Sequence, residues 1–134
     1  MRAWVNGTFR TAYEAALSAF DHGLPVGDGV FETLKVVSGK PFALRRHLAR
    51  LSTSARGIGL PAPDLDIVKR AIDETLAANA GPSVGRLRIT VTGGDAPLGS
   101  ARGDATPTVI VAVGPPSTWH EAESVVVVPW TRNE

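Results

Sequence analysis

The order of apolar and polar residues predicts β-strands in several parts of this chain of 134 residues. Residues 30–37 are rich in β-branched and aromatic side chains and predict a mostly buried strand, whereas 86–92 alternates and predicts a strand with one polar face. Apolar runs at 109–113 and 124–128 predict two more strands. An Asn-Gly pair at 6–7 is a strong hairpin signal, so we expect a short strand on either side of it.

Two other segments repeat their apolar residues every three or four positions, which predicts amphipathic helices. They cover 44–58 and 65–76, and Asp64 is well placed to cap the second helix. A Ser-Gly turn at 38–39 leads into 42–44, which we expect to pair with the strand before the turn. The pattern as a whole predicts an α+β fold, a mostly antiparallel sheet with two packed helices.

Composition is that of one ordinary globular domain, with 43% hydrophobic and 20% charged residues. The absence of cysteine excludes disulfides, Cys-ligated zinc and a thiol nucleophile. No apolar run approaches the roughly 18 residues of a membrane span, and no signal peptide is recognisable, so we expect a cytoplasmic protein without a membrane partner. A net charge of +1 also argues against a nucleic-acid partner. The basic residues that cluster are few: Arg45, Arg46, Arg50 and Arg56.

A glycine-rich run precedes the strand at 30–37. Gly23, Gly27 and Gly29 lie within seven residues, and Asp28 stands between two of them. Glycine allows positive φ and close backbone approach but weakens a sheet, so the run indicates either a functional site or a tight corner. We expect Asp28 to cap backbone N–H groups of this turn.

Two motifs follow each other at the spacing of a known enzyme family. Gly-Asp-Gly-Val-Phe-Glu-Thr occupies 27–33, and Phe-x-Leu-x-x-His-Leu-x-Arg-Leu-x-x-Ser-Ala occupies 42–55. Together they resemble the class IV, PLP-dependent aminotransferases, which include branched-chain and D-amino-acid aminotransferases and 4-amino-4-deoxychorismate lyases. The resemblance covers essentially the whole chain. It implies the small N-terminal domain of the D-amino-acid aminotransferase-like fold, with pyridoxal 5'-phosphate (PLP) as cofactor. Such relatives keep a segment like 11–20 extended, although its alanines favour a helix, and both readings stay open.

The resemblance implies roles for four residues. Arg50, in the His-Leu-x-Arg-Leu motif, would bind the phosphate of PLP, and Phe31 would line the substrate pocket. Arg88 would face a carboxylate of the substrate, with Arg86 as the competing candidate on the same strand face. Arg102, in the loop at 93–106, would supply a second cation.

Two further positions bear on the site. Val26 stands where some relatives carry an aromatic pocket residue, so the sequence does not determine which substrate side chain the pocket accepts. His47 is expected to pack against the strand as a structural residue rather than to act chemically.

No lysine in the chain matches the lysine that carries the family's chemistry. Lys35 lies in a predicted strand, Lys40 in a turn and Lys69 on the exposed face of a helix. In the family the catalytic lysine follows a segment like 129–134, so we expect it beyond Glu134 and expect the chain alone to be inactive.

The resemblance also implies a division of the chain. Residues 1–118 would form the small domain, and 119–134 would be the interdomain segment and the start of an absent large domain.

These observations predict the N-terminal half of a PLP-dependent enzyme. Arg88 and the loop at 93–100 favour a 4-amino-4-deoxychorismate lyase, which releases pyruvate from aminodeoxychorismate and leaves 4-aminobenzoate. Transamination of branched-chain or D-amino acids is the alternative, because the two branches share these motifs. A non-catalytic binding or dimerisation module is a third possibility. The resemblance implies a homodimer.

Overall fold

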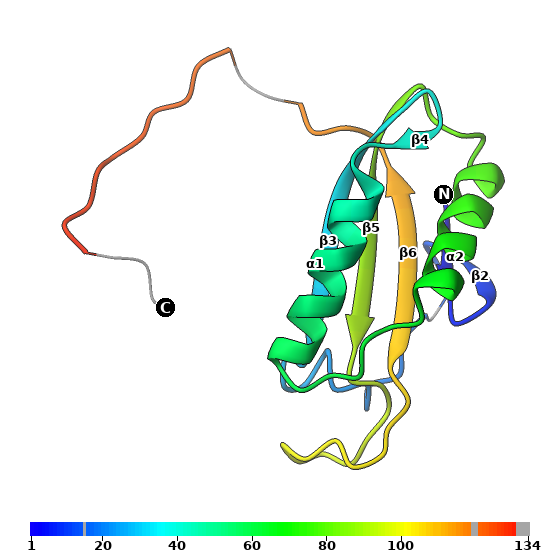
Figure 1. Cartoon of the computed structure of the whole chain (residues 1–134), viewed down its shortest axis with the longest axis vertical. Helices are drawn as coiled ribbons and strands as arrows, with labels where there is room; N and C mark the ends of the chain where they lie inside the picture. Colours follow the sequence, from blue (N-terminus) through cyan, green and yellow to red (C-terminus); the bar gives the residue numbers. More distant parts are fainter. Residues whose placement is uncertain (15, 119–120, 131–134) are drawn as a thin grey trace.

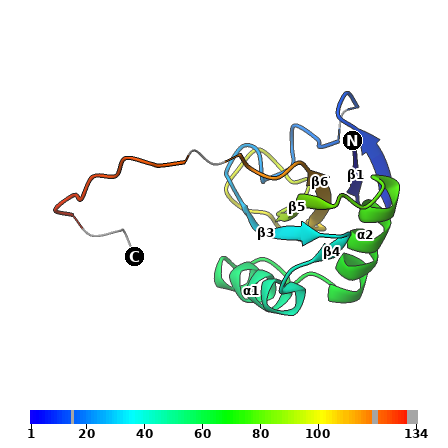
Figure 2. The same cartoon turned by 90° about the horizontal axis from the view of Figure 1, so that it is seen from above.

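Antiparallel strands form one sheet, and two helices cover one of its faces (Figures 1 and 2). The computed structural model describes residues 1–14, 16–118 and 121–130. The strands run in the order β2-β1-β6-β5-β3-β4 within these residues. The α+β prediction is confirmed. The elements are β1 (Arg2–Val5), β2 (Thr8–Thr11), β3 (Gly29–Val37), β4 (Lys40–Pro41), α1 (Leu44–Gly57), α2 (Leu65–Ala78), β5 (Val84–Thr92) and β6 (Thr108–Gly114).

Tight turns make the two hairpins. Asn6 and Gly7 have φ of 43° and 89° between β1 and β2, as their sequence predicted. The second hairpin corrects one prediction, because β3 pairs with Lys40–Pro41 instead of 42–44. Ala43 has φ of 53° and turns the chain out of the sheet into α1, although the Phe42 N–H still donates to the β3 edge.

The long pair β3–β5 divides the sheet into two faces. Successive side chains of a strand point to opposite faces, so Leu34 and Val36 of β3 lie with Leu87 and Ile89 of β5. These residues form the core beneath α1 and α2, and we call this side the helix-covered face. The other side, called the open face, carries a different set of side chains from β3 and β5: Phe31, Thr33, Lys35, Arg86, Arg88 and Thr90.

Both predicted helices form, and their ends have different causes. Asp64 caps α2, where its Oδ1 accepts from the Asp66 and Ile67 N–H groups at 2.8 and 3.2 Å, as predicted. Among the described residues no side chain caps α1, which starts after the left-handed Ala43. Ile58 was predicted on the apolar face of this helix but lies beyond its end and is exposed.

Two segments differ from their predicted elements. The described part of 11–20 forms turns and bends after β2 ends, with no helix. Residues 124–128, predicted as a strand, have no strand neighbour within the described part of the chain, and Val127 is 98% exposed. This segment leaves the sheet on the side of β3 and α1 (Figures 1 and 2). The predicted boundary at 118/119 borders residues outside the described ranges.

None of the helices in the described residues has the length and apolar character needed to cross a bilayer.

Candidate functional site

Two loops meet at the end of the sheet where β3 begins. Gly29 pairs with Thr92, so the loops before β3 and after β5 lie together. The buried carboxylate of Asp21 accepts from the Gly23 N–H and the Thr92 hydroxyl, both at 2.9 Å. The buried His22 donates its backbone N–H to the Gly94 carbonyl at 2.9 Å. These bonds fix the glycine-rich entry to β3.

Asp28 and Arg102 add an ion pair between the same loops. Nη1 of Arg102 bonds Asp28, and Nη2 bonds the Gly59 carbonyl at 2.7 Å. The expectation that Asp28 caps the turn is therefore wrong, and Asp21 does so instead. A Cβ on Gly93 would come within 2.7 Å of the Asp28 carboxylate and 2.9 Å of Arg102, so this position must be glycine for the pair to form.

On the helix-covered face, a buried carboxylate receives three donors from α1. Glu32 is 3% exposed. Arg50 donates side-on, with Nε to Oε1 and Nη2 to Oε2, both at 2.5 Å. His47 lies one turn earlier, and its Nδ1 lies 2.7 Å from Oε2. Since a carboxylate only accepts, Nδ1 of His47 carries the proton in this contact.

The hydrogen bonds set the ionisation of this cluster. Donation by Arg50 lowers the pKa of Glu32 below its usual 4.5, burial opposes this, and His47 lowers it further. The same bond raises the pKa of Arg50. Glu32 is thus a carboxylate at neutral pH. The expectation that His47 packs against the strand is confirmed, and its partner is a charged side chain.

On the open face, Arg88 stacks on Phe31. Its guanidinium carbon lies 3.7 Å from the centroid of the ring. Arg88 is the direct partner of Thr33, and Phe31 is the diagonal neighbour, within reach of a long side chain. Phe31 keeps 55% of its surface exposed. The structure therefore joins two of the predicted substrate residues on one accessible face.

The four predicted residues do not form one cluster. Arg50 belongs to the helix-covered side, Phe31 and Arg88 to the open face, and Arg102 to the loop end, where it lines a hollow of about 620 Å³ with Val26 and Asp28.

The outer edge of β3 lies between the first two groups. Within the described residues β4 pairs only with Val36 and Val37, so this edge has no neighbouring strand from Gly29 to Thr33. A ligand that contacts both Arg50 and Phe31 must pass this edge.

Arg50 has the donors that a phosphate group needs. Its side chain is 66% exposed, and Glu32 occupies Nε and one N–H of Nη2. Nη1 has no hydrogen-bond partner among the described residues, so a planar charged fork stays available. The residues present therefore fit the phosphate of PLP.

Glu32 was not among the predicted site residues, nor was its pairing with Arg50 predicted. A signal was available, because Glu32 falls on the same strand face as Val30, Leu34 and Val36. A charged residue in such a row needs a partner. The sequence does not say which helix supplies it.

The three lysines lie apart from the cluster of Glu32, His47 and Arg50. Lys35 is on the open face, Lys40 is in β4, and Lys69 pairs with Asp66 at 2.9 Å on α2.

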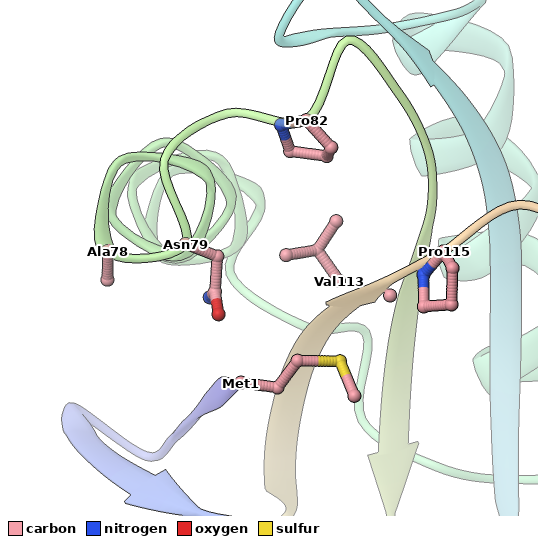
Figure 3. Close-up of a pocket in the computed structure, with 7 residues that line it drawn as sticks. Met1, Ala78, Asn79, Pro82, Val113 and Pro115 are labelled. Atoms are coloured by element: carbon pink, nitrogen blue, oxygen red, sulfur yellow. The ribbon is translucent and has the colours of Figure 1, made fainter.

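Another hollow, of about 440 Å³, lies between the end of α2 and the end of β6 (Figure 3). Asn79 and Pro82 face Met1 and Val113 across it. It is lined by no ionisable side chain and by none of the predicted site residues, so it is not the candidate site.

Comparisons with known proteins agree with the motifs. Residues 29–134 match the family described as amino-transferase class IV. The bifunctional aminodeoxychorismate lyase / D-amino acid transaminase of Mycobacterium tuberculosis is 38% identical over 103 residues, which cover 74% of this chain and 33% of that protein.

Solved structures agree as well. The 4-amino-4-deoxychorismate lyase of Pseudomonas aeruginosa is 37% identical, with a TM-score of 0.73 over 89% of this chain and 42% of that chain. A hypothetical aminotransferase from Mycobacterium tuberculosis in its PLP-bound form is 34% identical, with a TM-score of 0.75 over 86% of this chain and 39% of that chain. Its structure with α-ketoglutarate and PMP is also known. The first curated relatives are matched over 17–24% of their length, so this chain spans a minor part of them.

Proposed function

The chain belongs to the aminotransferase class IV family, and from this premise we propose that it supplies the phosphate-binding arginine and part of the substrate pocket of a PLP-dependent enzyme. The observation that carries the proposal is the geometry of Arg50. Glu32 holds its guanidinium side-on, and Nη1, which has no partner among the residues that the structure describes, can donate to an anion. PLP, when bound, supplies an electron sink for carbanionic charge at the substrate.

On the substrate side, Phe31 and Arg88 would orient the substrate on the open face. The ring offers an apolar surface, and the guanidinium offers charge-assisted hydrogen bonds to a carboxylate. Arg102 would have to exchange Asp28 and Gly59 for a substrate, so its role would require the loops to rearrange. The lysine for the chemistry would come from outside this chain.

We propose 4-amino-4-deoxychorismate lyase activity, with release of pyruvate and 4-aminobenzoate. Aminodeoxychorismate carries two carboxylates, which suits the cations of the open face. The lyase relatives, at 37% and 38% identity, support this choice.

Transamination of branched-chain or D-amino acids is the second candidate. The relative named as both lyase and D-amino acid transaminase supports it, because one protein combines the two activities. A homodimer and a cytoplasmic location remain predictions.

Replacement of Arg50 in the full-length protein tests the proposal through the affinity for PLP. Arg50→Ala should weaken PLP binding by about 1.5–3 kcal/mol, and Arg50→Lys should restore part of the affinity, because an ammonium lacks the planar fork. Binding of pyridoxal, which has no phosphate, should change little. Arg46→Ala, on the same helix, is the matched control. Equal PLP affinities for wild type and Arg50→Ala would contradict the phosphate role.

A separate experiment distinguishes lyase activity from transaminase activity. Full-length protein with PLP should convert aminodeoxychorismate to pyruvate and 4-aminobenzoate. Transamination of leucine, valine or D-alanine without lyase activity would select the second candidate instead. A full-length protein that binds no PLP would support the non-catalytic module.

A further inference from the structure

A second cationic cluster lies on the open face, one step along the sheet from the stacked pair. Lys35 and Arg86 are direct cross-strand partners in β3 and β5. Both line a hollow of about 370 Å³, and Thr33 and Ser117 add two hydroxyls to it. Nη1 of Arg86 bonds the Ser117 hydroxyl at 2.8 Å, which fixes the guanidinium against the chain that follows β6. Two cations and two hydroxyl groups therefore surround one small space.

No carboxylate of the described strands lies on the open face with these two cations. The described strands contain one acidic residue, Glu32, and it is buried on the helix-covered face. Neither Lys35 nor Arg86 forms an ion pair with the described residues. Like charges placed directly opposite each other destabilise an antiparallel pair. An anion bound between them would remove that repulsion.

We propose that Lys35 and Arg86 form a distal anion subsite, which binds the second carboxylate of a dicarboxylic substrate whose first carboxylate lies at Arg88. The inference rests on the proposed function, because that function places the substrate at Phe31 and Arg88. Residues two apart on a strand are roughly 7 Å from each other, which sets the scale between the two carboxylates. With a monocarboxylic substrate, water alone would solvate Lys35 and Arg86.

The hollow favours a small molecule over an acidic protein surface as the occupant. It is bounded by β3, by β5 and by Pro116 and Ser117 of the following segment, and its volume of about 370 Å³ is in the range of small-molecule sites. A carboxylate end has this size and can accept from the ammonium, the guanidinium and the two hydroxyls.

The experiment compares dicarboxylates with a monocarboxylate in the full-length, PLP-loaded protein. Binding of glutarate, adipate and hexanoate is measured by calorimetry for wild type, Lys35→Gln, Arg86→Gln and the control Lys69→Gln on α2. We expect each of the first two variants to lose roughly tenfold in affinity for the tighter dicarboxylate, the usual scale of one charge-assisted contact. Hexanoate binding should not change, and Lys69→Gln should behave as wild type.

Acetylation locates the bound dicarboxylate on the protein, which calorimetry does not. The dicarboxylate should protect Lys35 from acetylation, followed by mass spectrometry, and should leave Lys69 unprotected. Circular dichroism verifies that the variants fold, which is expected because both side chains are exposed.

Three results would count against the inference. Unchanged dicarboxylate binding in both variants, or equal losses for dicarboxylates and hexanoate, would overturn the subsite and leave PLP binding intact. Protection of Lys35 without any ligand would mean that protein covers this face, which also overturns it. A wild type that binds no PLP would overturn the proposed function and the inference with it, so the two failures are distinguishable.

Discussion

The two faces of β3 differ in whether their charged side chains are paired. On the helix-covered face, the buried carboxylate of Glu32 has three N–H donors, from Arg50 and His47. On the open face, Lys35 and Arg88 are exposed and have no carboxylate among the described residues. An unpaired charge costs several kcal/mol when it is buried, whereas water solvates an exposed one. The helix-covered face therefore contains a fixed ion pair, whereas the cations of the open face are available for a ligand.

The largest difference between the two faces should appear in the free energy of unfolding of variants at neighbouring residues. Leu34 is fully buried under the helices, and Thr33 next to it faces the open side. Leu34→Ala should lower the free energy of unfolding by about 2–5 kcal/mol, because it leaves a cavity in the core. Thr33→Ala should lower it by about 1 kcal/mol or less, because Thr33 is only half-buried and the change costs β-propensity without a core cavity. Urea denaturation followed by circular dichroism measures both, and similar losses would remove the distinction between the faces.

Loss of a cation from the open face should affect the substrate strongly. In the full-length enzyme, Arg88→Leu should slow pyruvate release from aminodeoxychorismate by roughly 10²-fold, or about 3 kcal/mol, since a charge-assisted contact is lost. Transamination of leucine or valine should stay unchanged or improve, because an arginine facing methyl groups is costly to desolvate. Steady-state kinetics with both substrate classes measure this. An equal loss for both classes would assign Arg88 a structural role.

Glu32→Gln should loosen the ion pair on the covered side. We expect a loss of about 1–2 kcal/mol in unfolding free energy, since Arg50 and His47 lose a charged acceptor, while Arg50 stays solvated. The pKa of Glu32 is lowered by folding, so its contribution is present above the unfolded value near 4.5 and is lost as the pH falls through the lower folded value.

Unfolding measured from pH 7 to pH 3 tests the pH dependence of this contribution. The difference between wild type and Glu32→Gln should shrink toward the acid end. Asp66→Asn, which removes an exposed pair on α2, is the control and should change stability little. A constant difference at every pH would show that the Glu32 charge is not responsible.

The smallest effect is expected at the loop end. Asp28→Asn weakens the pair with Arg102, and global stability should fall by less than about 1 kcal/mol, because loops can open without unfolding the sheet. Amide exchange in the loop at 93–107 should become faster, whereas exchange in β5 should not. Unchanged exchange in that loop would mean that Asp21 and His22 are sufficient to hold it.

The sequence by itself determined the elements whose cause is local. Alternation in β5, helical spacing in α1 and α2, the Asp64 cap and the Asn6-Gly7 turn depend on near neighbours, and all were predicted. The two motifs also predicted the family and named Phe31 and Arg50, and the wider resemblance named Arg88; the roles of these three residues stay predictions.

Only the tertiary structure decided which distant groups meet. Asp28 is 74 residues from Arg102, and no periodicity specifies such a pair, so the expected turn cap was wrong. The pairing of β3 with β5 and α1 sent Glu32 inward to Arg50 and Phe31 outward to Arg88. An apolar run such as 124–128 becomes a strand only where another strand offers hydrogen bonds, and the described residues offer none. Strand register and long-range packing therefore decided which partners the two faces of β3 meet, because those partners come from elements far away in the sequence.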